Sequence, residues 1–146
     1  MNAYRGIPAL LILLAGCGGG SSGMTTSPTS TTLTDAVTAI TNMNPAPGTA
    51  LQAGQTVTFT GTAAYTLASA DTGIMVIVVQ DQTGRPLPSN DVVPAVAVRR
   101  GSADATLSWT ATVPASGVTT VRVFFGLAGS GASSTNAVLS VSYPVR

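Results

Sequence analysis

Hydrophobic and polar residues alternate along most of the chain after residue 35. The clearest case is "QTVTFTGTAAYTL" at 55–67, where threonines occupy most positions of one phase. The other phase holds Val57, Phe59, Ala63, Tyr65 and Leu67. A period of two residues is typical of a strand with one face in a core and the other in water. The pattern therefore predicts a strand at 55–67, with Gly61 at a bend or bulge.

Six further stretches carry strand patterns: 36–42, 74–79, 93–98, 105–113, 118–127 and 139–145. The stretch at 74–79 is apolar in both phases, as in a strand covered on both faces. Pro94 places 93–98 at a sheet edge. Turns are predicted between the strands at "NPAPG", "ADTG", "DQTGRP", "RRGSAD", "PASG" and "AGSGASS". Seven short strands separated by turns predict an all-β fold, a seven-stranded Ig-like antiparallel β-sandwich over residues 36–146.

The aromatic residues differ in phase. Most fall on inward phases and are predicted core residues: Phe59, Tyr65, Trp109, Phe125 and Tyr143. Phe124 lies on the outward phase beside Arg122. If strands 74–79 and 118–127 pair, Phe124 shares its surface with one of the two apolar rows of 74–79.

An apolar patch on the outside of a sheet often marks a partner surface. We therefore predict that this patch is a surface for a protein or glycan partner. Of the two apolar rows of 74–79, we assign the odd-numbered one to the patch. Its members are Phe124, Arg122, Met75, Ile77 and Val79. The alternatives are that a loop or the N-terminal segment covers it, or that the phase is shifted by one residue.

Residues 1–16 show a different pattern, with Arg5 before an apolar stretch at 7–15 that ends in small residues. These are the parts of a secretory signal peptide. A helix needs about 20 apolar residues to cross a bilayer. The segment is therefore predicted to direct export and to be removed, not to remain as a span.

The sequence Leu14-Ala15-Gly16-Cys17 resembles the lipobox of bacterial lipoprotein signal peptides. The resemblance implies cleavage before Cys17, a diacylglycerol on its sulfur and an acyl chain such as palmitate on its new amino group. A single cysteine in an exported protein fits this use. Gly18, in place of the aspartate that retains many lipoproteins at the inner membrane, favours the outer membrane or the cell surface.

Residues 17–35 follow as a tether rich in Gly, Ser and Thr. Such a composition does not bury enough apolar surface to fold. A flexible coil of this length has a root-mean-square span of ~20 to 25 Å. We therefore expect a lipidated Cys17, a flexible linker and a folded domain at 36–146.

Two stretches of strand and turn sequence resemble Ig-like and fibronectin-III-like modules of bacterial envelope and surface lipoproteins. They are "PGTALQAGQTVTFTGTAAYTLASADTG" and "VPASGVTTVRVFF". The paired cysteines of antibody domains are missing. The resemblance implies a non-enzymatic module for binding, adhesion or structural support. The fold alone does not identify a ligand.

Charge and composition narrow the chemistry further. The chain has six arginines and five aspartates but no Lys, Glu or His, for a net charge of +1. A net charge this close to zero gives no basic patch for binding nucleic acid. Without His, a Ser-His-Asp triad and a His-based zinc site are excluded. We therefore expect no catalytic residue, no bound metal and no cofactor.

Two weaker chemical hypotheses depend on the aspartates. Asp71-Thr72-Gly73 matches the tripeptide of aspartic proteases, in which two such carboxylates share a proton, so this chain would have to dimerise. Calcium needs six to eight oxygens, and no Asp-x-Asp spacing is present. The expected function is thus a lipid-anchored envelope module. Its alternatives are an accessory subunit of an export or surface-assembly machine and, third, an enzyme.

Overall fold

The computed structural model describes residues 34–89, 92–135 and 137–146, and these residues form five β-strands. The strands are β1 (Ala36–Asn44), β2 (Thr56–Asp81), β3 (Ala95–Thr112), β4 (Thr120–Gly129) and β5 (Ala137–Pro144). All strand pairs between them are antiparallel. The described residues form one compact unit. The all-β antiparallel class is therefore confirmed.

Five strands replace the expected seven because two predicted pairs are continuous. The stretches 55–67 and 74–79 both belong to β2, and 93–98 and 105–113 both belong to β3. The turns predicted at "ADTG" and "RRGSAD" are wrong, since both segments are extended. Leu67 lies opposite Gly101 and Thr72 opposite Arg99, with a register shift between them, so the two strands bend together.

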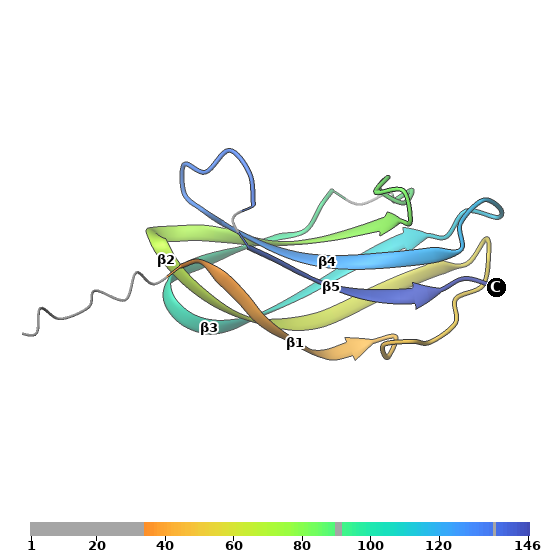
Figure 1. Cartoon of the computed structure of the whole chain (residues 1–146), viewed down its shortest axis with the longest axis horizontal. Coiled ribbons are helices and arrows are strands. Elements are labelled where there is room, and N and C mark those ends of the chain that lie inside the picture. The colour runs from red at the N-terminus through yellow and green to blue at the C-terminus, as the bar shows by residue number, and fades with distance from the viewer. Residues whose placement is uncertain (1–33, 90–91, 136) are drawn as a thin grey trace, which may run out of the picture. The chain divides into compact units, whose positions relative to one another are not determined.

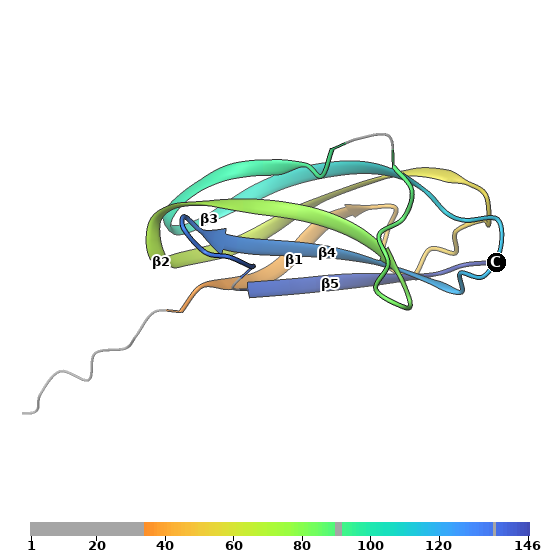
Figure 2. The ribbon, with the colours of Figure 1, turned by 90° about the horizontal axis from the view of Figure 1, so that it is seen from above.

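Small residues make this shared bend possible. Residues 68–70 of β2 are Ala, Ser and Ala, and Gly101 of β3 has a φ of 112°. Glycine adopts such a φ at little cost, and an unequal number of residues between paired positions kinks a ladder without ending it. Figures 1 and 2 show β2 and β3 turning back at the end of the unit where β1 begins. The sheet thus curls around one core.

The two halves of β2 have different neighbours. Residues 60–66 pair with β1 on one side and with 102–108 of β3 on the other. Residues 73–81 pair with β4, which pairs in turn with β5. At the start of this second half, residues 73–76 also pair with residues 95–98 of β3. The curled sheet therefore has one inner surface and two outer regions.

The inner surface holds the residues that alternation assigns to it. The predicted core aromatics Phe59, Tyr65, Trp109, Phe125 and Tyr143 are all buried. Trp109 is 4% exposed, and its Nε1 donates a hydrogen bond to Ser89 Oγ at 2.8 Å. The inward phases are confirmed at these positions.

Gly61 lies at the predicted bulge, whose extra residue is on the neighbouring strand β1, and it is also a packing position. It faces inward, and β2 continues past it in unbroken register with β3. A Cβ at Gly61 would lie 2.7 Å from Phe125 Cζ and would also clash with Met43 Sδ. On the β1 side, Thr41 pairs with Thr62 and Asn44 with Thr60, so a register shift with one extra residue in β1 lies opposite Gly61. Gly61 is therefore a packing position that leaves room for the Phe125 ring.

Candidate functional site

The outer region formed by the second half of β2 with β4 and β5 contains the predicted partner surface. Val78 pairs with Phe124, and Gln80 pairs with Arg122. Residues directly opposite each other in an antiparallel pair project to the same side. Phe124 and Arg122 thus lie on the outer surface, as their phase predicted, and Phe124 is half-buried there beside Val78.

The predicted row on β2 needs a correction. Met75, Ile77 and Val79 are 0% exposed and belong to the core. The row that shares the outer surface with Phe124 is the alternate one, Ile74, Val76 and Val78. Both rows are apolar, so alternation within 74–79 does not distinguish them. Only the pairing of β2 with β4 does.

The apolar surface extends to both sides of this row. Val138 of β5 pairs with Gly126 of β4, which in turn pairs with Val76. Ile74 is 46% exposed and Val138 is 51% exposed, the highest values for large apolar side chains on the described strands. We call the outer surface formed by Ile74, Val76, Val78, Phe124 and Val138 the apolar face. The side chain of Thr135, from the loop before β5, covers its centre, since a Cβ on Gly126 would lie 2.8 Å from Thr135 Cγ2.

Arginines flank the apolar face at its two ends. Arg99 lies opposite Thr72, next to the Ile74 end, and Arg122 follows Phe124 at the other end. Both arginines are exposed. None of the four aspartates that the structure describes occupies an outward position on the strand segments of this face. Among the described residues, Arg122 is therefore the one charged group on the outward positions of these strand segments, while Arg99 lies beside the exposed Asp71–Arg100 pair at the other end.

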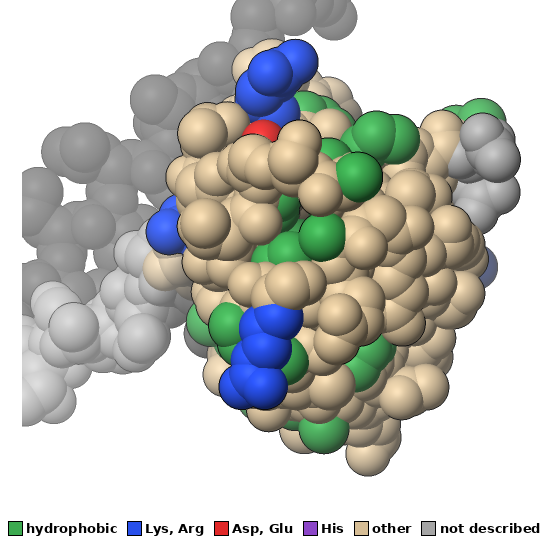
Figure 3. All heavy atoms as spheres, turned by 90° about the vertical axis from the view of Figure 1, so that its right-hand side faces the viewer, with side chains coloured by type: hydrophobic (Ala, Val, Ile, Leu, Met, Phe, Trp, Pro, Cys, Tyr) green, Lys and Arg blue, Asp and Glu red, His purple; other side chains and the backbone are tan. Residues whose placement is uncertain are grey.

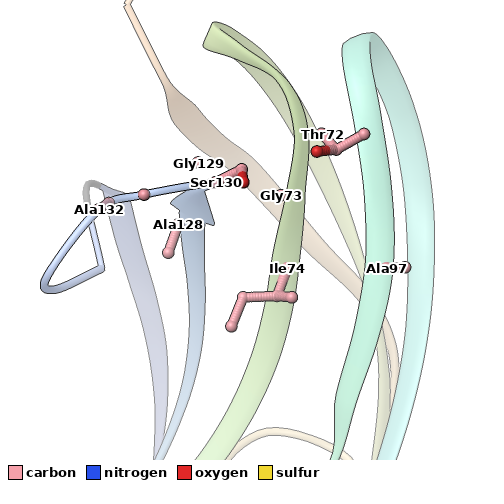
Figure 4. Close-up of a pocket in the computed structure, with 9 residues that line it drawn as sticks. Thr72, Gly73, Ile74, Ala97, Ala128, Gly129, Ser130 and Ala132 are labelled. Carbon is pink, nitrogen blue, oxygen red and sulfur yellow. The ribbon is translucent and has the colours of Figure 1, made fainter.

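A hollow of about 380 Å³ opens at the Ile74 end of the apolar face (Figure 4). It is lined by Thr72, Gly73, Ile74, Ala97, Ala128, Gly129, Ser130, Gly131 and Ala132. Ser130 N donates to Thr72 O at 2.8 Å and fixes the loop after β4 to β2. The lining offers small apolar side chains, hydroxyls and backbone, with no ionisable group. It provides shape but no acid, base or thiol.

The chain enters the folded unit next to this hollow. Asp35 Oδ1 accepts hydrogen bonds from Ala68 N at 2.8 Å and Ser69 N at 2.9 Å, and its Oδ2 accepts one from Ser69 Oγ at 2.5 Å. Ser69 packs against Gly129, since a Cβ on Gly129 would lie 2.6 Å from Ser69 Oγ. Because Gly129 lines the hollow, Asp35 is linked to the hollow through Ser69.

The other outer region, on β1, the first half of β2 and the second half of β3, is polar. Five hydroxyl pairs cross from β2 to β3: Thr56–Thr112, Thr58–Thr110, Thr60–Ser108, Thr62–Thr106 and Thr66–Ser102. Their oxygen–oxygen distances are 2.8–3.0 Å. We call this surface the hydroxyl face. It has a composition opposite to that of the apolar face.

The end of the unit that carries the C-terminus has no continuous apolar surface. Figure 3 shows its hydrophobic side chains in separate groups with arginines spread between them. A hollow of about 320 Å³ lies there between the turn after β2 and the loop after β3. Gln82 joins these segments, because its Nε2 donates to Gly117 O at 2.9 Å and its Oε1 accepts from Thr119 N at 3.2 Å.

Asp81 lines that second hollow but is already engaged in its own turn. Its Oδ1 accepts hydrogen bonds from Thr83 Oγ1 at 2.6 Å, Thr83 N at 2.8 Å and Arg85 N at 3.0 Å. The hydrogen bond from the Thr83 hydroxyl is the main cause that lowers the pKa of Asp81 below its ordinary value of 3.8. A carboxylate held ionised in this way stabilises a turn and is not poised to donate a proton.

The Asp71-Thr72-Gly73 motif does not form a paired-carboxylate site in this unit. Asp71 Oδ1 lies 2.9 Å from Arg100 Nε, and the two side chains are 90% and 55% exposed. Among residues 34–89, 92–135 and 137–146, no group of three or more Cys, Asp, Glu or His side chains is placed to hold a metal ion. In the same ranges, no helix is long and apolar enough to cross a membrane.

The predicted lipidation site lies outside the described residues. This site consists of Cys17 and the lipobox residues Leu14, Ala15 and Gly16. The fifth aspartate, Asp91, also lies outside the described residues. Cleavage before Cys17 and its acylation stay predictions. What the structure adds is the point of entry at Asp35 and the two contrasting outer faces.

Comparison with known proteins finds little that is similar. No family model and no curated protein match the chain. Two solved structures of a β-glucosidase from Listeria innocua, one of them in complex with isofagomine, align with 73% of this chain at 18% identity and a TM-score of 0.41. This chain spans 15% of the length of that chain. No family membership and no function follow from a similarity of this size.

Proposed function

We propose that this protein is a lipid-anchored, non-enzymatic envelope module that acts through surface contact in binding, adhesion or structural support. The observation that carries the proposal is the contrast between the apolar face and the hydroxyl face on one small unit. An exposed apolar surface of this kind is typical of contact sites on soluble domains. The lipobox-like sequence at 14–17 supplies the anchor in this proposal.

The pairing of the strands supports an Ig-like or fibronectin-III-like sandwich as the finer description of the fold. One half of β2 pairs with β1 and with the second half of β3, while the other half pairs with β4 and the start of β3. Counted on either side of the shared bend, β2 and β3 supply two segments each. With β1, β4 and β5 they make seven segments in two groups, as in a sandwich.

The ionisable groups of the described residues support a non-catalytic role. Asp81 is occupied by its turn, Asp71 by Arg100 and Asp35 by the bend of β2. The hollow beside Ile74 has no ionisable group in its lining. A general acid or base needs a positioned group with a suitable pKa. Asp35 and Asp81 instead hold a strand bend and a turn in place.

Density-gradient fractionation of cell envelopes tests the proposal. The wild-type protein should sediment with the outer membrane, and Cys17→Ala should no longer do so because it has no sulfur to acylate. Ser21→Ala, a change in the same tether, is the matched control and should behave as the wild type. A Cys17→Ala protein that still sediments with the outer membrane would contradict the proposed anchor.

A further inference from the structure

We propose that the apolar face rests on the membrane that holds the lipid anchor, while the hydroxyl face is turned to water. This inference rests on the proposed lipidation of Cys17 and adds an orientation to it. The partner of the apolar face is thus a phospholipid surface.

The distribution of side chains makes the folded unit amphipathic as a whole. Ile74, Val138 and the half-buried Phe124 project from one outer region. The other outer region presents paired Thr and Ser hydroxyls along β2 and β3. An amphipathic structure binds at a membrane interface with its apolar side towards the acyl chains and its polar side towards water.

The point where the chain enters the unit favours contact with the anchoring membrane. Asp35 is held by the bend of β2 through Ser69, which packs against Gly129 at the edge of the hollow. Ile74 lines the same hollow and belongs to the apolar face. Asp35 is 18 residues from Cys17 in the sequence, so this end of the apolar face is the part of the unit nearest along the chain to the proposed anchor. Tethering raises the effective concentration of a second contact, so a weak contact suffices.

Charge distinguishes a phospholipid surface from a second copy of the chain. A symmetric dimer brings the same patch of both subunits together. Across the apolar face, this would place Arg122 of both copies in one interface with no carboxylate of that face between them. Phosphate groups of lipids instead accept arginine side chains at the edge of an apolar contact.

A single thiol placed on each face tests the orientation in the full-length lipidated protein. Cys17 is the only cysteine of the chain, so acylation leaves an introduced cysteine as the one free thiol. Val138→Cys labels the apolar face, and Ser108→Cys, also exposed, labels the hydroxyl face. Each protein is labelled with a fluorophore and reconstituted in vesicles of phosphatidylethanolamine and phosphatidylglycerol. Iodide in the buffer then quenches labels that face water.

The inference predicts several-fold weaker iodide quenching at position 138 than at position 108. Adding Ile74→Glu to the Val138→Cys protein should restore quenching, whereas Thr58→Glu on the hydroxyl face should not. Equal quenching at both positions in vesicles overturns the inference. Protection of position 138 only in native membranes, and not in pure lipid, also overturns it, because the apolar face then meets a protein.

Separate measurements test the proposed acylation of Cys17 and the proposed orientation of the folded unit. If mass spectrometry finds Cys17 unmodified, the proposed anchor is wrong. The same labels are then read in a Cys17→Ser background with the vesicles added to the protein. Protection of position 138 by added lipid upholds the membrane-binding face, and its absence overturns that face.

Discussion

Single residues decide how closely the layers of this unit approach. Gly61 lies in the middle of a long strand where a larger residue would have higher strand propensity. The Phe125 ring occupies the space that its Cβ would need. Sequence reasoning assigned Gly61 to a bulge because glycine in a strand commonly marks one. Close approach of another residue is the other common reason, and both apply here, because β1 has an extra residue opposite Gly61.

Gly61→Ala should therefore destabilise the protein by about 1–3 kcal/mol through overpacking. Phe125→Leu removes the ring and also destabilises, but the double variant should lose less than the sum of the two single changes, since the alanine methyl then meets only the flexible Met43 side chain. Urea unfolding of the four proteins measures this coupling. Strictly additive losses would show that the ring and Gly61 are not in contact.

Asp81 gives the turn after β2 a dependence on acid. Because folding lowers the pKa of Asp81 below 3.8, its contribution to stability is present above that pH and is lost as the pH falls through the lowered value. Asp81→Asn should unfold at lower urea concentration than the wild type near neutral pH, and the difference should shrink below about pH 4.

Thr83→Ala provides the check on the cause, because the Thr83 hydroxyl contributes most to the lowered pKa. The stability of this variant should vary less with pH in the acid range than that of the wild type. A constant difference between Asp81→Asn and wild type from neutral to strongly acid pH would exclude ionised Asp81 as the stabilising species.

At the scale of strands, the sequence was informative about position and weak about continuity. Alternating runs marked every strand segment because the core face needs apolar side chains at every second position. The turns predicted at 70–73 and 99–104 were wrong because small residues and Gly signal a turn as readily as a bend within a paired ladder. Pairing between β2 and β3 on both sides of the bend, which no local pattern reveals, keeps each strand whole.

In the candidate site, too, one feature could be predicted from the sequence and another could not. The outward phase of Phe124 was readable because its neighbours Val123 and Phe125 are clearly inward. The choice between the two rows of 74–79 was not readable, since both are apolar. The inward row became apparent only from the register that pairs Val78 with Phe124.

Asp35 joins the start of β1 to the bend of β2, and its removal should act on that bend. Asp35→Ala leaves the amides of Ala68 and Ser69 without the carboxylate oxygen that accepts from them. We expect the free energy of unfolding to fall by about 1–3 kcal/mol, as when a buried donor loses a charged acceptor. Because the site is partly exposed, the lower end of this range applies.

Asp71→Ala is the matched control for Asp35→Ala. It removes an exposed ion pair with Arg100, which should change stability by less than about 1 kcal/mol. Hydrogen exchange should rise at Ala68 and Ser69 in Asp35→Ala and stay unchanged there in Asp71→Ala. Faster exchange of these two amides in both variants would mean that the bend responds to any change at this end.

The whole protein combines a proposed anchor with a unit whose two outer faces differ. The apolar face lies on the second half of β2, β4 and β5, and the chain enters the unit beside one end of it. The hydroxyl face lies on the remaining strands. This arrangement gives an anchored module one preferred side for contact and one for water, which is the physical basis of the proposed function.

Mass spectrometry of the N-terminal peptide of the mature protein tests the central claim most directly. We expect the mature chain to begin at Cys17 and this residue to carry a diacylglycerol on its sulfur and an acyl chain on its amino group. A mature protein that retains residues before Cys17, or one that begins there with an unmodified thiol, would contradict it.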